Sequence, residues 1–250
     1  MIYYYLGILK KFSFNKGINF LKLFFGFHLS RIIHKPLQFG LPFFISVEPT
    51  TSCNFRCPQC PSGLRSFTRE TGMLNPEFFE KIIFQMKSHL HTLTFYFQGE
   101  PFLNPSFLKM VGIANSYNIY TSTSTNAHYL NEEIARQTVL CKLDKMIISI
   151  DGTTQESYEK YRVGGDIEKV IDGTKNILKQ KKILNSRTPH VVWQFVVFRH
   201  NEHQIEQARE LSKQLGLDGK LIQAEMMKGD YENLINVFDK HFGEFVTLYR

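Results

Sequence analysis

Three cysteines stand within eight residues of one another at the spacing C-x3-C-x2-C, namely Cys53, Cys57 and Cys60. Cysteine thiolates bind zinc and iron–sulfur clusters. Zinc normally takes a fourth Cys or His, and no histidine lies in this short stretch. A cubane iron–sulfur cluster held by three cysteines keeps one iron free for a substrate or cofactor. The spacing therefore indicates a metal centre and leaves zinc and a cluster as alternatives.

The fourth cysteine and the region before the first one bear on the cellular compartment. Cys141 follows an apolar helical segment, so we expect it to pack in the core. Three crowded thiols do not form an even disulfide framework, and no secretory signal pattern precedes them. No stretch reaches the ~18 apolar residues of a membrane-spanning helix. We therefore expect a cytoplasmic protein.

The composition of the 250 residues is that of a globular protein, with 43% hydrophobic and 21% charged residues. This excludes disordered and fibrous classes. The net charge of +7 is unevenly placed, because residues 1–47 hold six basic and no acidic residues. The rest of the chain is nearly neutral, so no nucleic-acid partner is predicted.

The elements that must position the cysteines follow an alternating pattern. Six short apolar or β-branched runs predict strands over 43–48, 92–97, 119–124, 145–150, 191–198 and 220–225. Helix-start signals lie between them, at Asn75, Asn104, Asn131, Asp166 and Asn201. A helix-stop glycine, Gly216, follows the last of these. The pattern predicts an α/β fold, a partial (β/α)6 TIM-like barrel over residues 41–228.

A basic, aromatic-rich N-terminal extension over residues 1–40 precedes the barrel, and a helical tail over 229–250 follows it. The extension contains a predicted helix over 18–33. Its apolar residues repeat at helical spacing, at Ile18, Leu21, Phe25, Leu29 and Ile32. In one interpretation this stripe covers the barrel floor. In the other interpretation the stripe lies on a membrane surface, and residues 1–35 make a peripheral membrane contact.

The cysteine motif after the first strand of a partial barrel resembles that of the radical S-adenosylmethionine (radical SAM) enzymes. In that family the three cysteines hold a [4Fe–4S] cluster whose open iron is chelated by SAM. One-electron reduction cleaves SAM to methionine and a 5′-deoxyadenosyl radical, which abstracts a substrate hydrogen. The resemblance implies that Cys53, Cys57 and Cys60 are the cluster ligands.

The family also has SAM-binding motifs at the ends of later strands, and this sequence is similar at several of them. Gln98-Gly99-Glu100-Pro101 resembles a Gly-Gly-Glu motif that binds the SAM ammonium, with Gln98 in place of the first glycine. Thr125-Asn126-Ala127 resembles Thr-Asn-Gly. Two further motifs contain Ser149 with Asp151, and Arg162. The resemblance implies that SAM is bound by residues of all four motifs, namely Gly99, Glu100, Asn126, Ser149, Asp151 and Arg162. No second catalytic group stands out.

The stretch from residue 48 to 165 most resembles the peptide-modifying and cofactor-maturing branch of the family. Many members carry a cysteine-rich SPASM or Twitch extension, and no cysteine follows Cys141 here. The chain is therefore either a small single-cluster enzyme or a fragment of a longer one. The resemblance implies a peptide or small-molecule substrate and a flavodoxin- or ferredoxin-type electron donor. The alternatives are a non-catalytic zinc-binding protein and a degenerate SAM-binding protein.

Overall fold

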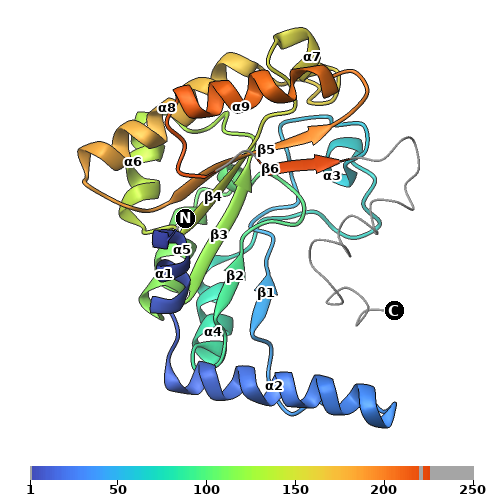
Figure 1. Cartoon of the computed structure of the whole chain (residues 1–250), viewed down its shortest axis with the longest axis vertical. Coiled ribbons are helices and arrows are strands. Elements are labelled where there is room, and N and C mark those ends of the chain that lie inside the picture. Colours follow the sequence, from blue (N-terminus) through green and yellow to red (C-terminus); the bar gives the residue numbers. More distant parts are fainter. Residues whose placement is uncertain (1, 220–221, 226–250) are drawn as a thin grey trace.

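The protein is built around one parallel β-sheet with its strands in chain order. The structure, a computed structural model, describes residues 2–219 and 222–225. The sheet order is β1-β2-β3-β4-β5-β6, and every neighbouring pair is parallel. The strands are β1 Phe44–Ser46, β2 Thr92–Thr94, β3 Tyr120–Thr125, β4 Lys145–Ser149, β5 His190–Val197 and β6 Ile222–Glu225. All six predicted strands are present, which confirms the partial barrel (Figure 1).

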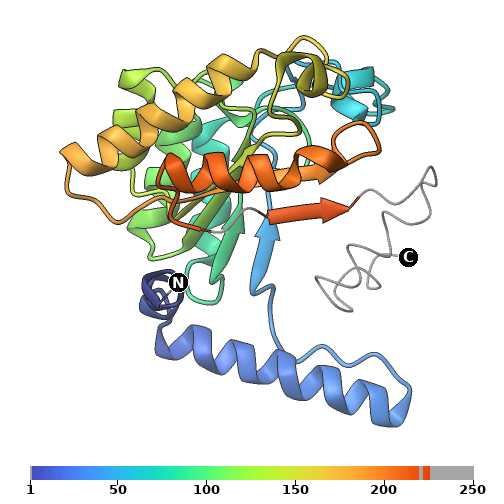
Figure 2. The ribbon, with the colours of Figure 1, turned by 45° about the horizontal axis from the view of Figure 1, so that its top comes forward.

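Helices connect consecutive strands and lie outside the curved sheet (Figure 2). The connecting helices are α3 Pro61–Leu64, α4 Pro76–Met86, α5 Phe107–Ser116, α6 Glu132–Leu140, α7 Gln155–Glu159, α8 Ile167–Ile183 and α9 Ile205–Gln214. Short 3₁₀ turns, Pro101–Leu103 and Glu202–Gln204, follow β2 and β5. The core lies between sheet and helices and includes Phe79, Ile83 and Trp193, all fully buried. Cys141 packs against this core, as predicted.

Three of the five predicted caps, Asn75, Asn131 and Asp166, begin a helix. Asn75 and Asn131 accept hydrogen bonds of 2.9 Å from the backbone amides of Phe78 and Ile134, at the starts of α4 and α6. α9 ends at Gln214, and Gly216 follows with a φ of +74°. These caps depend on neighbouring residues alone, so local sequence was enough to predict them.

Two predicted caps have other roles. Asn104 lies before α5, whose N-cap is Ser106, and its side chain donates to the carbonyl oxygens of Pro49 (2.7 Å) and Leu74 (3.1 Å). The Asn201 side chain does not cap a helix. Its amide group donates to the Asp151 carbonyl oxygen at 2.9 Å. Both side chains are buried, and each donates to carbonyl oxygens of segments far away in the chain.

The N-terminal extension forms two helices, α1 Ile2–Lys10 and α2 Phe14–Ile33. α2 lies at the amino ends of the strands, opposite their carboxyl ends (Figure 1). The interpretation that its apolar stripe covers the barrel floor is wrong, because all five of its residues are exposed, from 38% for Ile18 to 73% for Ile32. The structure instead buries Lys16, Asn19 and Gly26 of this helix.

Polar contacts explain this orientation of α2. The Lys16 ammonium donates to the Asn118 carbonyl at 2.7 Å, and Asn19 exchanges two hydrogen bonds with the backbone of Leu41. No described helix is long and apolar enough to cross a membrane. The predicted tail over 229–250 lies outside the described residues, and the division into three segments stays a prediction.

Candidate active site

The three cysteines lie in one long loop between β1 and α4, at the carboxyl end of the first strand. Two backbone hydrogen bonds close its base, from Leu74 to Pro49 at 2.9 Å and from Thr51 to Gly72 at 3.2 Å. Inside it, α3 begins directly after Cys60. A side chain at Gly63 would lie 2.6 Å from the Cys57 backbone, so this glycine lets the helix close on the cysteines.

The thiols are free and differ in their surroundings. Cys57 is 4% exposed, whereas Cys53 and Cys60 are half-buried. The Phe55 amide donates to the Cys53 sulfur at 3.4 Å, and the Cys60 thiol contacts Gln98 Oε1 at 3.5 Å. An amide donor stabilises a thiolate, so the Phe55 contact favours the ligand form of Cys53.

Burial raises the pKa of the Cys53 thiol to about 11. Burial also raises the pKa of Cys57, and the nearby Arg162 guanidinium opposes that shift. Both thiols therefore keep their protons at neutral pH until a cation replaces them. Metal ligation by thiolates releases such protons.

Gly99 brings the end of β2 against the cysteine loop. Its φ is +80°, and a Cβ there would lie 2.0 Å from the Thr50 carbonyl oxygen. The Gly99 amide donates to Ser62 Oγ at 2.9 Å, and the next amide, of Glu100, donates to the Ser52 carbonyl at 2.8 Å. No other residue fits so close an approach at this φ.

Glu100 is a buried carboxylate, 2% exposed, beside that loop. It accepts hydrogen bonds from Thr125 Oγ1 (2.7 Å), the Asn126 amide (2.8 Å) and the Phe102 amide (3.3 Å). Burial raises its pKa to about 7, which these hydrogen bonds only partly offset. It forms no ion pair with any described residue, so the site has a place for a cationic ligand.

Asn126 joins the end of β3 to the cysteine loop. Its amide donates to Glu100, and its Nδ2 donates to Asn54 Oδ1 at 2.8 Å. The next residue, Ala127, has a φ of +63°. This is the left-handed conformation that glycine adopts most easily, at the position where the resembling motif has glycine.

Asp151 and Arg162 form a short ion pair on the other side of the site. Asp151 is fully buried, and its other oxygen accepts from the Val196 amide at 2.7 Å. Asp151 raises the pKa of Arg162 above its ordinary value, although burial alone would lower it. Because both Asp151 oxygens already have protein donors, Asp151 is suited to hold Arg162 in place.

The segment around Arg162 reaches the cysteine loop, because the Arg56 amide donates to the Val163 carbonyl at 3.0 Å. Ser149 ends β4, paired in register with Gln194. It is buried, and within the described residues its hydroxyl has no hydrogen-bond partner. The ends of β1 to β4 thus place the predicted residues at one end of the sheet.

The contacts of three residues in this site, Gln98, Ser62 and Asn54, were not predicted from the sequence. Gln98 Oε1 accepts from Ser62 Oγ at 3.2 Å and from the Cys60 thiol, so it braces the loop that carries the third cysteine. Asn54 holds Asn126. The signal for Gln98 was its place beside Gly99, whereas nothing in the sequence pointed to the Asn54 contact, which spans 72 residues.

The sequence profile of the radical SAM superfamily matches residues 47–212, more than half of the chain. The chain belongs to the radical SAM superfamily. Membership implies two cofactors, a [4Fe–4S] cluster and S-adenosylmethionine, and the peptide- and cofactor-maturing branch is consistent with the relatives that match.

Two curated relatives cover most of the chain. Mycofactocin maturase MftC of Mycobacterium ulcerans is 26% identical over 178 residues, 70% of this chain and 45% of that protein. A tungsten-containing aldehyde ferredoxin oxidoreductase cofactor-modifying protein of Pyrococcus furiosus is 24% identical over 185 residues, 72% of this chain and 50% of that protein. The chain spans about half the length of these relatives.

Two solved structures share the fold. Streptococcus suis SuiB bound to S-adenosylmethionine matches with a TM-score of 0.63 at 15% identity, over 83% of this chain and 48% of that one. HydG, a maturase of the [FeFe]-hydrogenase, matches with a TM-score of 0.56 at 12% identity, over 74% of this chain and 43% of that one.

The residues present fit the two radical SAM cofactors. Cys53, Cys57 and Cys60 are free thiols of one loop, and a [4Fe–4S] cluster takes one thiolate at each of three separate irons. The zinc alternative is not favoured, because the radical SAM profile matches residues 47–212. Glu100, buried and without an ion pair to any described residue, suits the ammonium group of SAM.

Proposed function

We propose that this chain performs the reductive cleavage of S-adenosylmethionine in an enzyme that modifies a peptide. When the cluster and SAM are bound, one-electron reduction supplies a 5′-deoxyadenosyl radical that abstracts a substrate hydrogen. The observation that carries the proposal is that Glu100, a buried carboxylate without an ion-pair partner among the described residues, is hydrogen-bonded to the end of β3 beside the cysteine loop.

In this proposal each residue of the chain has a defined part. Cys53, Cys57 and Cys60 ligate the cluster, and Glu100 binds the SAM ammonium by charge-assisted hydrogen bonding. Gly99 brings Glu100 against the cysteine loop, at the contact of its amide with Ser62.

The other predicted SAM residues divide into contact and positioning residues. Arg162 faces the SAM carboxylate, and Asp151 orients Arg162 through their ion pair. Asn126 holds Glu100 and the loop together, and Ser149 offers a hydroxyl that no described residue engages.

The substrate class rests on the names of relatives. One relative is a mycofactocin maturase, and SuiB, with which this chain shares the fold, has been solved bound to precursor peptide SuiA. A small-molecule substrate is the second candidate, because another relative, 23% identical, is an AdoMet-dependent heme synthase of Methanosarcina barkeri. The electron donor in this proposal is of flavodoxin or ferredoxin type.

Anaerobic reconstitution with iron and sulfide, reduction with dithionite and addition of SAM test the activity. We expect 5′-deoxyadenosine to form. A cluster that forms while SAM stays intact would favour a degenerate SAM-binding protein, and zinc binding without any cluster would overturn the proposal. Replacing dithionite by a reduced flavodoxin tests the donor.

Deuterium transfer tests the substrate class. The reconstituted protein is turned over separately with the peptide fraction and the small-molecule fraction of fully deuterated cells. We expect deuterium in 5′-deoxyadenosine from the peptide fraction. Label from the small-molecule fraction alone would contradict a peptide substrate.

A further inference from the structure

Helix α2 buries two polar side chains against the protein and leaves an apolar stripe exposed. Toward the body it buries Lys16 and Asn19, which hydrogen-bond to backbone carbonyls of Asn118 and Leu41. A helix that stabilises a globular core normally buries its apolar stripe instead. The hydrogen bonds of Lys16 and Asn19 hold this orientation, and packing against the barrel does not account for the apolar stripe.

The outward stripe is continuous along α2. Its members recur every three or four residues, so they share one face about 27 Å long. They are exposed from 38% to 83%, and comprise Phe14, Ile18, Leu21, Phe25, Leu29 and Ile32. A contiguous apolar surface of this size on a globular protein marks an interaction site.

The charges around the stripe select the partner. Residues 1–47 contain no acidic residue. Lys22 and Arg31, both exposed, lie about 80° and about 100° from Phe14 on opposite sides of the helix axis. An apolar stripe with cationic residues on both flanks is complementary to an anionic bilayer, into which the stripe inserts while the cations meet the headgroups.

A second copy of the chain fits this surface less well. Pairing two α2 stripes would bring Lys22 and Arg31 of both copies together, and the segment offers no acidic residue to offset their repulsion. Charge complementarity therefore favours lipid over a second copy.

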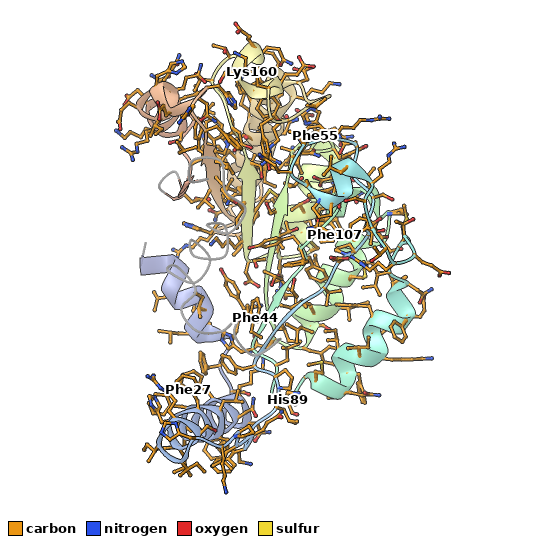
Figure 3. All side chains as sticks on the ribbon, turned by 90° about the vertical axis from the view of Figure 1, so that its right-hand side faces the viewer. Phe27, Phe44, Phe55, His89, Phe107 and Lys160 are labelled. Atoms are coloured by element: carbon orange, nitrogen blue, oxygen red, sulfur yellow. The ribbon has the colours of Figure 1, made fainter. Side chains whose placement is uncertain are left out.

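We propose that α2 is a membrane-surface helix that docks the protein on an anionic bilayer. The docked surface lies opposite the active site. Figure 3 shows Phe27 of α2 at one end of the molecule and Phe55 of the cysteine loop toward the other. Docking would therefore leave the carboxyl ends of the strands facing away from the lipid. This inference is independent of the proposed radical chemistry.

Vesicle flotation of the full chain tests the proposal, using phosphatidylcholine vesicles with and without about 30% phosphatidylglycerol. We expect binding to the anionic vesicles and little to the neutral ones. The double variant F25S/I32S should lower the partition coefficient by about tenfold or more. The matched control F78S/I183S replaces residues of similar exposure elsewhere and should bind like the wild type.

Two further double variants test how much the cationic residues contribute to membrane binding. K22Q/R31Q should weaken binding to the anionic vesicles by about tenfold or more, whereas K169Q/K182Q, which removes two exposed lysines of α8, should not. Circular dichroism establishes that each variant is folded.

Three results would overturn the proposal. They are no flotation of the wild-type chain with anionic vesicles, equal binding to neutral vesicles, and unchanged binding of F25S/I32S. Sedimentation velocity adds a fourth. If the wild type does not bind vesicles but forms a dimer, and F25S/I32S is a monomer, the stripe is the interface with a second copy.

Discussion

The carboxylate of Glu100 accepts a hydrogen bond of 2.8 Å from the backbone amide of Asn126, across the ends of two neighbouring strands. Thr125 Oγ1 adds a second, at 2.7 Å. Burial raises the pKa of this carboxyl to about 7, and its hydrogen bonds and the charge of Arg162 offset that shift only partly. A group with this pKa changes charge within the range in which the protein would bind SAM.

We therefore expect SAM affinity to depend on pH through Glu100. Below a pH of about 7 the carboxyl is protonated and loses its attraction for the SAM ammonium. Affinity should rise from pH 6 to pH 7.5, by up to about tenfold per pH unit below the pKa. Equilibrium dialysis of SAM with the reconstituted protein measures this.

Glu100→Gln is the control for the pH effect. It keeps the shape of the side chain and removes its charge, so binding should be weaker at pH 7.5 and independent of pH. A variant that binds SAM like the wild type at every pH would exclude Glu100 as the ammonium ligand.

Gly99→Ala should disrupt the junction between β2 and the cysteine loop. The added Cβ would lie 2.0 Å from the Thr50 carbonyl oxygen, at a φ of +80°. We expect a loss of about 3 kcal/mol or more in the free energy of unfolding, or a displaced loop that retains little iron. Urea unfolding and iron content after reconstitution measure the two effects.

Gly164→Ala is the control that separates the steric clash of an added Cβ from the strain of a positive φ. Gly164 has a φ of +84°, but a Cβ added there would meet no atom within 4 Å. This variant should lose only about 1–2 kcal/mol. Equal losses for the two variants would mean that the close approach of Gly99 to Thr50 contributes nothing.

Asp151→Asn should leave the Arg162 guanidinium without its counterion. Asp151 is fully buried and the Arg162 side chain is 17% exposed, so solvent screens the pair only partly. We expect a loss of about 2–3 kcal/mol in the free energy of unfolding. In a double-mutant cycle with Arg162→Gln, the combined loss should be smaller than the sum, and strictly additive losses would contradict the coupling.

An exposed pair supplies the comparison. Asp172 and Lys175 lie 3.4 Å apart on α8, both more than half exposed. Asp172→Asn should change the free energy of unfolding by less than about 1 kcal/mol.

Cys57→Ala should prevent assembly of the cluster while the barrel remains folded. The side chain removed is small, and the loop around it is held by backbone hydrogen bonds. Iron content and the visible absorption of the reconstituted protein should both fall to background. Cys141→Ala removes a thiol that packs against the core, outside the cysteine loop, and should retain the cluster. Iron retained in Cys57→Ala would show that the ligand assignment is wrong.

Much of the fold was predictable from short stretches of sequence. The strands are apolar or β-branched runs, and the caps Asn75 and Asn131 bond to amides three residues away. Such signals depend on residues that are close in the chain, so they can be recognised without the tertiary structure. The spacing of Cys53, Cys57 and Cys60 is local in the same sense.

Contacts between distant segments were decided by the tertiary structure. Asn104 and Asn201 resemble helix caps in sequence, yet each donates to a loop carbonyl about fifty residues away. Gln98 braces the third cysteine because the loop after β2 lies beside α3. A buried polar side chain hydrogen-bonds to the groups that the fold places beside it, and only the folded chain determines which groups those are.

Helix α2 shows the same division. The sequence by itself determined a helix with an apolar stripe and a cationic segment without acidic residues. It did not determine which side of the helix meets the barrel, because the periodicity of apolar residues defines a helix face but not what that face contacts. The tertiary structure decided this through Lys16, which reaches the Asn118 carbonyl 102 residues away and turns the stripe outward.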